Sequence, residues 1–225
     1  GALKAGVLAT TYTARQGLLL MIPSIYKMAG EMLPGVIHVA ARSLSTHSLS
    51  IFGDHQDIYA VRQTGACMLS SSSVEEAYHM AMVSHLASIK SSLPFINFFD
   101  GFRTSHEIDK VKEIDLSKLE TFIDKKDLRK FRDNGMISGA TTRGTAENED
   151  VYFQHTESRN GYYTKAIDNV IYYMDKINKI CKTDYKPFNY YGDKSSNEVI
   201  IAMGSVCECI KEVVDNLNKN GKKVG

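Results

Sequence analysis

Acidic, amide and imidazole side chains stand together in one short turn of this chain, made of Asp54, His55, Gln56 and Asp57. Carboxylate and imidazole are the usual groups for general acid–base catalysis and for binding divalent metals. Four adjacent residues on one turn cannot all converge on one ion, so a hydrogen-bonded loop that positions another group is favoured over a metal site. We therefore treat the four residues as a candidate active-site loop and predict no metal ligands.

Arg42 is the second candidate, because it directly follows the apolar run Val36–Ala41. A guanidinium at the end of a buried strand can bind a carboxylate or a phosphate through two parallel hydrogen bonds. The alternative is an exposed arginine in a surface ion pair. Spacing alone slightly favours that alternative, since most arginines are structural.

A further polar segment follows the apolar run Pro94–Phe99 and contains Asp100, Arg103, His106 and Glu107. Ion pairs at i,i+3 and i,i+4 helical spacing explain these charges without a ligand. The pair Gly204-Ser205 has the pattern of a strand-to-helix turn that can bind an anion, but the full glycine-rich phosphate motifs are missing, so a plain tight turn is favoured. No GxSxG elbow or comparable arrangement identifies a nucleophile.

Buried strands are expected to position these groups. Apolar runs rich in β-branched residues alternate with segments of helical period, which is typical of parallel α/β architecture. The expected strands are Val36–Ala41, Ala66–Ser70, Pro94–Phe99 and Val199–Met203. The expected helices are Gln16–Glu31, Val74–Ser91 with Ser72 or Ser73 as its cap, Asp115–Arg132, Tyr162–Cys181 and Ser205–Asn220. Open α/β sheets bind ligands at the carboxyl ends of their strands, so the polar segments predict a binding edge there.

Composition describes an ordinary globular chain of 225 residues, with 43% hydrophobic residues, 24% charged residues and a formal net charge of +1. The basic balance of a nucleic-acid-binding protein is missing, so no nucleic-acid partner is predicted. No window approaches the roughly 20 uninterrupted apolar residues of a membrane span, so no membrane partner is predicted either. The four cysteines include no CxxC pair, and Cys67 and Cys207 lie in apolar runs, which predicts buried thiols in a reduced, intracellular protein.

Two domains are expected. The segment Lys186–Gly192 resembles a linker, so residues 1–186 are assigned to a first domain and residues 187–225 to a second, unfinished domain. The stretch Asn134–Asn160 has little hydrophobic periodicity, and so long an irregular segment is usually functional or an arm over another surface. We interpret the chain as a fragment, because Lys222–Gly225 begins a strand at which the sequence stops.

Several long motifs occur in order along the chain: Thr10–Pro23, Phe52–Asp57, Arg62–Gly65, Phe98–Glu107, Arg143–Ala146 and Tyr152–Gln154. Together they resemble pyruvate:ferredoxin (flavodoxin) oxidoreductase of the long single-chain type, over essentially the whole chain. The resemblance implies a thiamine-diphosphate-binding, pyrimidine-type parallel-sheet domain lacking its first part. The beginning of a transketolase C-terminal-like α/β domain would follow it.

The same resemblance implies oxidative decarboxylation of pyruvate with coenzyme A to acetyl-CoA and CO2. Electrons would pass through iron–sulfur clusters to ferredoxin or flavodoxin. Arg42 matches the family arginine that binds the pyruvate carboxylate, which reverses the preference stated above. The family's cofactor-activating glutamate and its substrate-contacting threonine would lie before Gly1, and the Mg2+ site and the 4Fe–4S clusters would lie in later domains. The fragment would thus hold no cofactor completely and be inactive alone.

The resemblance also implies a homodimer in the cytoplasm, with the organelle of an anaerobic protist as an alternative. Two other interpretations stay open at this point. One is a subunit of a multi-subunit 2-oxoacid:acceptor oxidoreductase, and the other is a non-catalytic α/β interaction module. The intact Arg42 and the complete Gly53–Asp57 loop argue against the second, because nothing structural obviously requires them.

Overall fold

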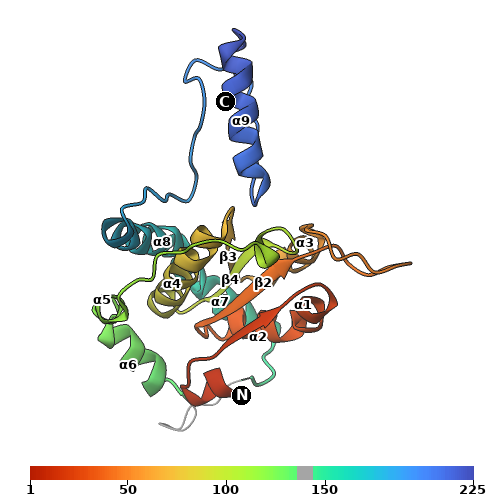
Figure 1. The fold of residues 1–225 in the computed structure, drawn as a ribbon. Coiled ribbons are helices and arrows are strands. Elements are labelled where there is room, and N and C mark those ends of the chain that lie inside the picture. The colour runs from red at the N-terminus through yellow and green to blue at the C-terminus, as the bar shows by residue number, and fades with distance from the viewer. Residues whose placement is uncertain (136–143) are drawn as a thin grey trace.

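The computed structural model describes residues 1–135 and 144–225, and its centre is a four-stranded parallel sheet in the order β1-β2-β4-β3 (Figure 1). The strands are Thr10–Thr13 (β1), Gly35–Ala41 (β2), Cys67–Ser71 (β3) and Pro94–Asp100 (β4). Three of them confirm the expected strands within a residue at either end. The edge strand β1 was missed, because its run of threonines with one tyrosine is exposed and lacks the apolar signal of a buried strand.

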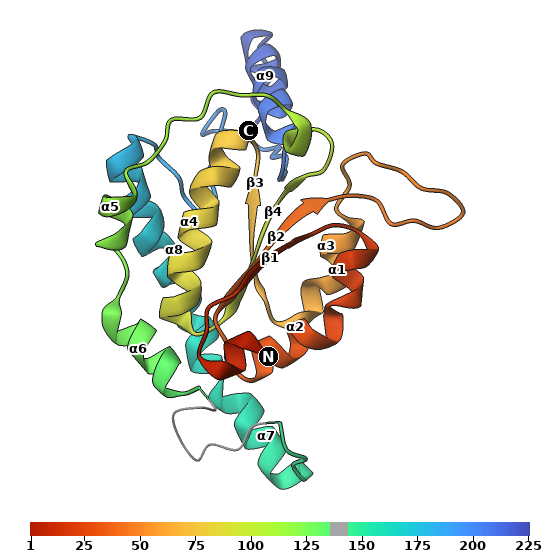
Figure 2. The ribbon, with the colours of Figure 1, turned by 60° about the horizontal axis from the view of Figure 1, so that its bottom comes forward.

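Helices cover both faces of the sheet. The α-helices are Gln16–Leu20 (α1), Ile22–Gly30 (α2), Gln56–Val61 (α3), Val74–Ser91 (α4), Leu116–Glu120 (α5), Lys125–Asp133 (α6), Glu149–Ser158 (α7), Asn160–Cys181 (α8) and Val206–Lys219 (α9). Short 3-10 turns span Ala2–Ala5, Arg62–Thr64 and Thr104–His106. In Figure 2, α1, α2 and α3 lie on one face of the sheet, and α4 and α8 lie on the other.

Successive side chains of the central strands point to opposite faces of the sheet, where they pack into two hydrophobic cores. In β2, Val36 packs with side chains of α4 and α8, whereas Ile37 and Val39 pack with side chains of α1, α2 and α3. The neighbouring β4 repeats the pattern with Phe95 on the first side and Ile96 on the second. Each such fully buried side chain stabilises the fold by about 1.5–3 kcal/mol, so these cores fix the register of the strands and where they end.

The predicted helix Val74–Ser91 is confirmed, and a serine caps it. Ser73 Oγ accepts a hydrogen bond from the backbone N–H of Glu76 at 3.1 Å, and Glu76 Oε2 accepts one from the N–H of Ser72 at 2.6 Å. This reciprocal capping satisfies backbone donors that the first helical turn leaves without partners. The serine run before α4 therefore serves the helix start.

Two predicted long helices are each divided. The segment Gln16–Glu31 forms α1 and α2, with Pro23 in the first turn of α2, where a proline is tolerated because its position needs no N–H donor. The segment Asp115–Arg132 forms α5 and α6, and Asp124 caps α6 by accepting hydrogen bonds from the N–H groups of Lys126 and Asp127. The break was not predicted, because charged residues and leucines recur at helical spacing both before and after Asp124.

The predicted strand Val199–Met203 is wrong. A single parallel bridge joins Glu198 to Val224, and Ile201 is 96% exposed. A strand needs a partner ladder, and the described residues offer this segment only the short stretch around Val224. In the segment Asn134–Asn160, the structure places α7 where no helix was predicted, and residues 136–143, with the start of the Arg143–Ala146 motif, lie outside the described residues.

The thiols and the last helix also bear on the predictions. All four cysteines are free, and Cys67 and Cys207, predicted to be buried, are partly buried, with Cys67 packed against the core beneath α4 and α8. Burial still raises the pKa of the Cys67 thiol to about 11. In Figure 1, α9 stands away from the sheet and approaches it at one end. Across the described ranges, no helix combines the length and the apolar character required to span a membrane.

Candidate functional site

The carboxyl ends of β2 and β4 lie side by side and bring the sequence-predicted residues together. Ala41 of β2 is level with Asp100 of β4, and the loop after β2 folds back so that Arg42 forms an antiparallel bridge with Gly53. The carbonyl of Ala41 accepts hydrogen bonds from Gly101 N–H at 2.8 Å and from Asp54 N–H at 3.4 Å. Arg42, the Asp54–Asp57 loop and Asp100 thus meet at the predicted edge.

Asp57 anchors the backbone around Arg42. Its side chain is fully buried, and one carboxylate oxygen accepts hydrogen bonds from the N–H groups of Arg15 at 2.8 Å and Arg42 at 3.2 Å. The other oxygen accepts from the N–H of Ile58 at 2.8 Å. Burial raises the pKa of Asp57, while these backbone donors act in the opposite direction. Asp57 thereby also holds Arg15, whose φ of 50° lies in a region that non-glycine residues seldom adopt.

His55 and Asp100 form an ion pair across the edge. His55 Nε2 lies 2.7 Å from Asp100 Oδ1, and the imidazole meets the ring of Phe98 edge-on at 5.5 Å between centroids. The hydrogen bond with Asp100 raises the pKa of His55, against the opposing effect of burial. Burial would raise the pKa of Asp100, but its hydrogen bonds with His55 and Ser205 outweigh that effect and lower the pKa to about 2.

The second oxygen of Asp100 binds the start of α9. Oδ2 accepts hydrogen bonds from Ser205 N–H at 2.9 Å and from Ser205 Oγ. A carboxylate at a helix N-terminus is stabilised by the exposed N–H groups and by the helix dipole. Gly204 has a φ of 80°, and a Cβ there would lie 2.8 Å from Asp100 Oδ1. A turn does precede α9 at Gly204-Ser205, but no strand leads into it, and a carboxylate, that of Asp100 of the same chain, binds at the helix start.

Arg42 is the exception in this network, because its guanidinium has little to bind. One Nη lies 3.5 Å from Ser105 Oγ, and Nε is buried without a hydrogen-bond partner. Within residues 1–135 and 144–225, no carboxylate lies within 4.0 Å of this guanidinium. The hydroxyls of Ser43 and Thr104, each next in sequence to a residue of this contact, are likewise buried without partners.

Gly101 makes room for the Arg42 side chain. A Cβ at position 101 would lie 2.2 Å from Arg42 Cγ and 2.5 Å from Arg42 Nε, so a larger residue would displace the arginine. A partly buried cation without an anion is costly, and a carboxylate with two oxygens would remove that cost through parallel hydrogen bonds. The described geometry therefore leaves the guanidinium able to bind an oxyanion such as a carboxylate or a phosphate.

Asp54 and Gln56 serve the loop itself. Asp54 Oδ1 accepts a hydrogen bond from Gln56 N–H at 2.8 Å, and Gln56 Oε1 accepts one from Leu44 N–H at 2.9 Å. In the part of the chain that the structure describes, no three His, Cys, Asp or Glu side chains are grouped to hold a metal ion. The four residues of the turn thus have separate partners.

The segment after β4 differs from its prediction. Asp100 pairs with His55 across the edge instead of forming a helical-spacing ion pair within its own segment, and His106 Nδ1 lies 2.8 Å from Ser105 Oγ. Ser105 was missed as a neighbour of Arg42. Gly53 and Gly101 were the sequence features that could have indicated this close packing, since glycines next to charged residues at strand ends indicate close approach of the backbone.

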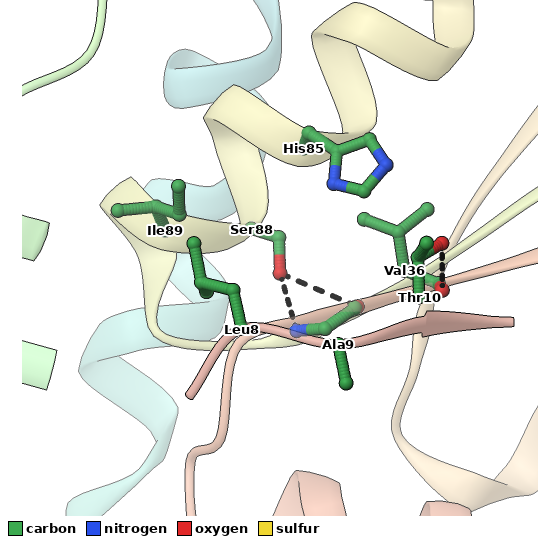
Figure 3. Close-up of a pocket in the computed structure, with 8 residues that line it drawn as sticks. Leu8, Ala9, Thr10, Val36, His85, Ser88 and Ile89 are labelled. Atoms are coloured by element: carbon green, nitrogen blue, oxygen red, sulfur yellow. Dashed lines mark hydrogen bonds between the residues drawn. The ribbon is translucent and has the colours of Figure 1, made fainter. Parts of the chain in front are cut away.

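Two cavities lie away from Arg42. One, of about 120 Å3, is lined by residues from the amino ends of β1 and β2 and by α4 (Figure 3). There Ser88 Oγ accepts a hydrogen bond from Gly35 N–H at 2.9 Å and donates one to the carbonyl of Leu93 at 2.6 Å. The other, of about 410 Å3, is lined by residues that include His38 and His85. Burial lowers the pKa of both imidazoles, that of His38 to about 4, so both are neutral near pH 7.

Comparisons with known proteins match a family of enzymes over most of the chain. The family model described as pyruvate flavodoxin/ferredoxin oxidoreductase, thiamine diphosphate-binding, matches residues 1–175. The chain is 54% identical to pyruvate-flavodoxin oxidoreductase of Enterobacter agglomerans and 50% identical to pyruvate:ferredoxin oxidoreductase of Moorella thermoacetica. Each alignment covers 100% of this chain and 19% of the relative, so the chain spans about a fifth of their length.

A solved structure has a similar fold. It is a 2-oxoglutarate:ferredoxin oxidoreductase from Magnetococcus marinus, with a TM-score of 0.54 and 15% identity. The match covers 99% of this chain and 41% of the other. At this identity the likeness supports the arrangement of the strands and helices and leaves the chemistry to the site itself.

Proposed function

Because the chain belongs to the pyruvate flavodoxin/ferredoxin oxidoreductase, thiamine diphosphate-binding family, we propose that it is one segment of a longer pyruvate oxidoreductase. The complete enzyme would convert pyruvate and coenzyme A to acetyl-CoA and CO2 and pass the electrons to ferredoxin or flavodoxin. In this proposal residues 1–186 are a first domain and residues 187–225 begin a second, and the chain requires the rest of the enzyme for activity.

Within that enzyme, Arg42 would bind the carboxylate of pyruvate. The observation that carries this assignment is the buried Arg42 Nε without an acceptor, beside Gly101 and held from the backbone by Asp57. A guanidinium keeps its proton at any relevant pH, so it orients the carboxylate and offsets its charge without entering proton transfer. Orientation of this kind can supply a large part of a rate enhancement.

The described residues at this edge do not by themselves fit thiamine diphosphate. The cofactor supplies, when bound, a ring that stabilises the charge left by decarboxylation, and the resemblance implies a carboxylate beside that ring. Asp57 and Asp100 both have their oxygens occupied by other groups of the chain, and Asp54 closes its own turn. We therefore confine the chemistry of this edge to the substrate carboxylate. In this proposal the chain holds thiamine diphosphate only in part, and the Mg2+ site and the clusters lie in other parts of the enzyme.

Arg42→Lys in the complete enzyme tests the assignment, because lysine keeps the charge and loses the bidentate fork. We expect the KM for pyruvate to rise by about 10- to 100-fold, which corresponds to the loss of a charged hydrogen bond. Arg62→Lys is the matched control, since Arg62 is an exposed arginine that donates to the carbonyl of Tyr59 at 2.7 Å. An Arg42→Lys enzyme with an unchanged KM would remove the assignment.

A further inference from the structure

We propose that Asp100 is a positioning residue for Arg42, and that through Asp100 the segment beginning at Ser205 is coupled to the carboxylate-binding position. The inference rests on the proposed role of Arg42 and adds to it a link between two parts of the chain. Asp100 is separated from Ser205 by 105 residues in sequence and contacts it directly. It is also level with Ala41, the residue just before Arg42.

Asp100 holds the Gly53–Asp57 loop in place opposite the backbone of Arg42. Its Oδ1 holds His55, and its side chain packs against Gly53, where a Cβ would lie 3.3 Å from Asp100 Cβ. Gly53 is the bridge partner of Arg42. Asp100 therefore fixes both the loop residue opposite Arg42 and the imidazole two residues further along.

Among the described residues, the guanidinium itself is held only weakly. Its contact with Ser105 Oγ, at 3.5 Å, is at the long limit for a hydrogen bond. Its stem lies against Gly101, the residue after Asp100. A movement of the end of β4 would thus move the wall on which the Arg42 side chain rests.

Asp100 also connects this edge of the sheet to the start of α9. Both donors of Ser205 reach the same oxygen of Asp100, and Gly204 permits this approach because a side chain there would meet the carboxylate. The start of α9 is consequently held to the residue that orders the Gly53–Asp57 loop. A displacement of α9 would be transmitted to the Arg42 position through one carboxylate.

The experiment is a double-mutant cycle in the complete enzyme, with Asp100→Ala, Arg42→Lys and the pair. We expect Asp100→Ala to raise the KM for pyruvate by about tenfold, within the range that misplacement of an orienting group produces, with the kcat at saturating pyruvate changed far less. If Asp100 acts through Arg42, Asp100→Ala adds little to the KM of an Arg42→Lys enzyme. Asp124→Ala is the matched control, because it removes a cap and an ion pair with Lys90 far from this edge and should leave the KM unchanged.

Ser205→Ala and Ser205→Thr complete the test and serve if Asp100→Ala fails to fold. Ser205→Ala removes the hydroxyl and keeps the backbone donor, so the KM should rise about two- to fivefold, as expected for loss of one hydrogen bond to a charged group that keeps another donor. Ser205→Thr should restore it. Full additivity of Asp100→Ala and Arg42→Lys in KM, or a Ser205→Ala enzyme with the wild-type KM, would overturn the inference. An Arg42→Lys enzyme without effect would instead overturn the proposed function.

Discussion

Arg42 Nε and Ser88 Oγ are both buried polar atoms beside a glycine near a strand end, yet their surroundings differ. Ser88 Oγ, at the amino end of β2, accepts from Gly35 N–H and donates to the carbonyl of Leu93, so its hydrogen-bonding capacity is used within the fold. Arg42 Nε, at the carboxyl end, has no partner, although Gly101 gives its side chain room. The difference separates a polar group whose hydrogen bonds are made within the fold from one that, in the proposed function, binds the substrate carboxylate.

The largest expected effect is on local stability and comes from Asp57, which is itself a buried polar group and also holds the backbone of Arg42. Asp57→Ala leaves the N–H groups of Arg15, Arg42 and Ile58 without their acceptor in a buried position, and should lower the free energy of local unfolding by about 3–5 kcal/mol. Amide hydrogen exchange of the segments around Arg15 and Arg42 measures it. Protection equal to that of the wild type in both segments would show that Asp57 does not anchor them.

Ser88→Ala examines the structural side alone. It deprives Gly35 N–H of its acceptor and the carbonyl of Leu93 of its donor, and should lower stability by about 2 kcal/mol. The KM for pyruvate of the complete enzyme should not change, because this cavity lies at the opposite end of the sheet from Arg42. A raised KM at unchanged stability would erase the distinction between the two positions.

Sequence reasoning located the edge but not its contacts. Apolar runs predicted β2 and β4 within a residue, because strands buried on both faces have a strong hydrophobic signal. Arg42 directly follows β2, and Asp100 is the last residue of β4. The pairing of Asp100 with His55 depends on strand order, which brings residues 45 positions apart together and leaves no local pattern. The exposed β1 had no such apolar signal, and Val199–Met203 had one without a partner strand to pair with.

The smallest expected effect is the pH dependence of the stability that the His55–Asp100 pair contributes next to Arg42. Asp100 has a folded-state pKa of about 2, below its ordinary value of 3.8, so its contribution to stability is present above pH 3.8 and is lost as the pH falls through 2. His55 has a raised pKa, so its contribution is complete below pH 6.5 and is lost as the pH rises through the folded-state value.

Solvent screening of this partly exposed pair reduces the expected contribution to about 1–2 kcal/mol. Asp100→Asn should therefore lower the denaturant midpoint near pH 5 and much less below pH 2, where most of the wild-type carboxyl is itself protonated. His55→Gln, which keeps a donor without the titration, should flatten the decline above pH 6.5. It should reduce the acid limb without removing it, because Ser205 still donates to Asp100. An equal loss for Asp100→Asn at both pH values would assign its effect to shape alone, and the ion pair would then carry no part of the support of Arg42.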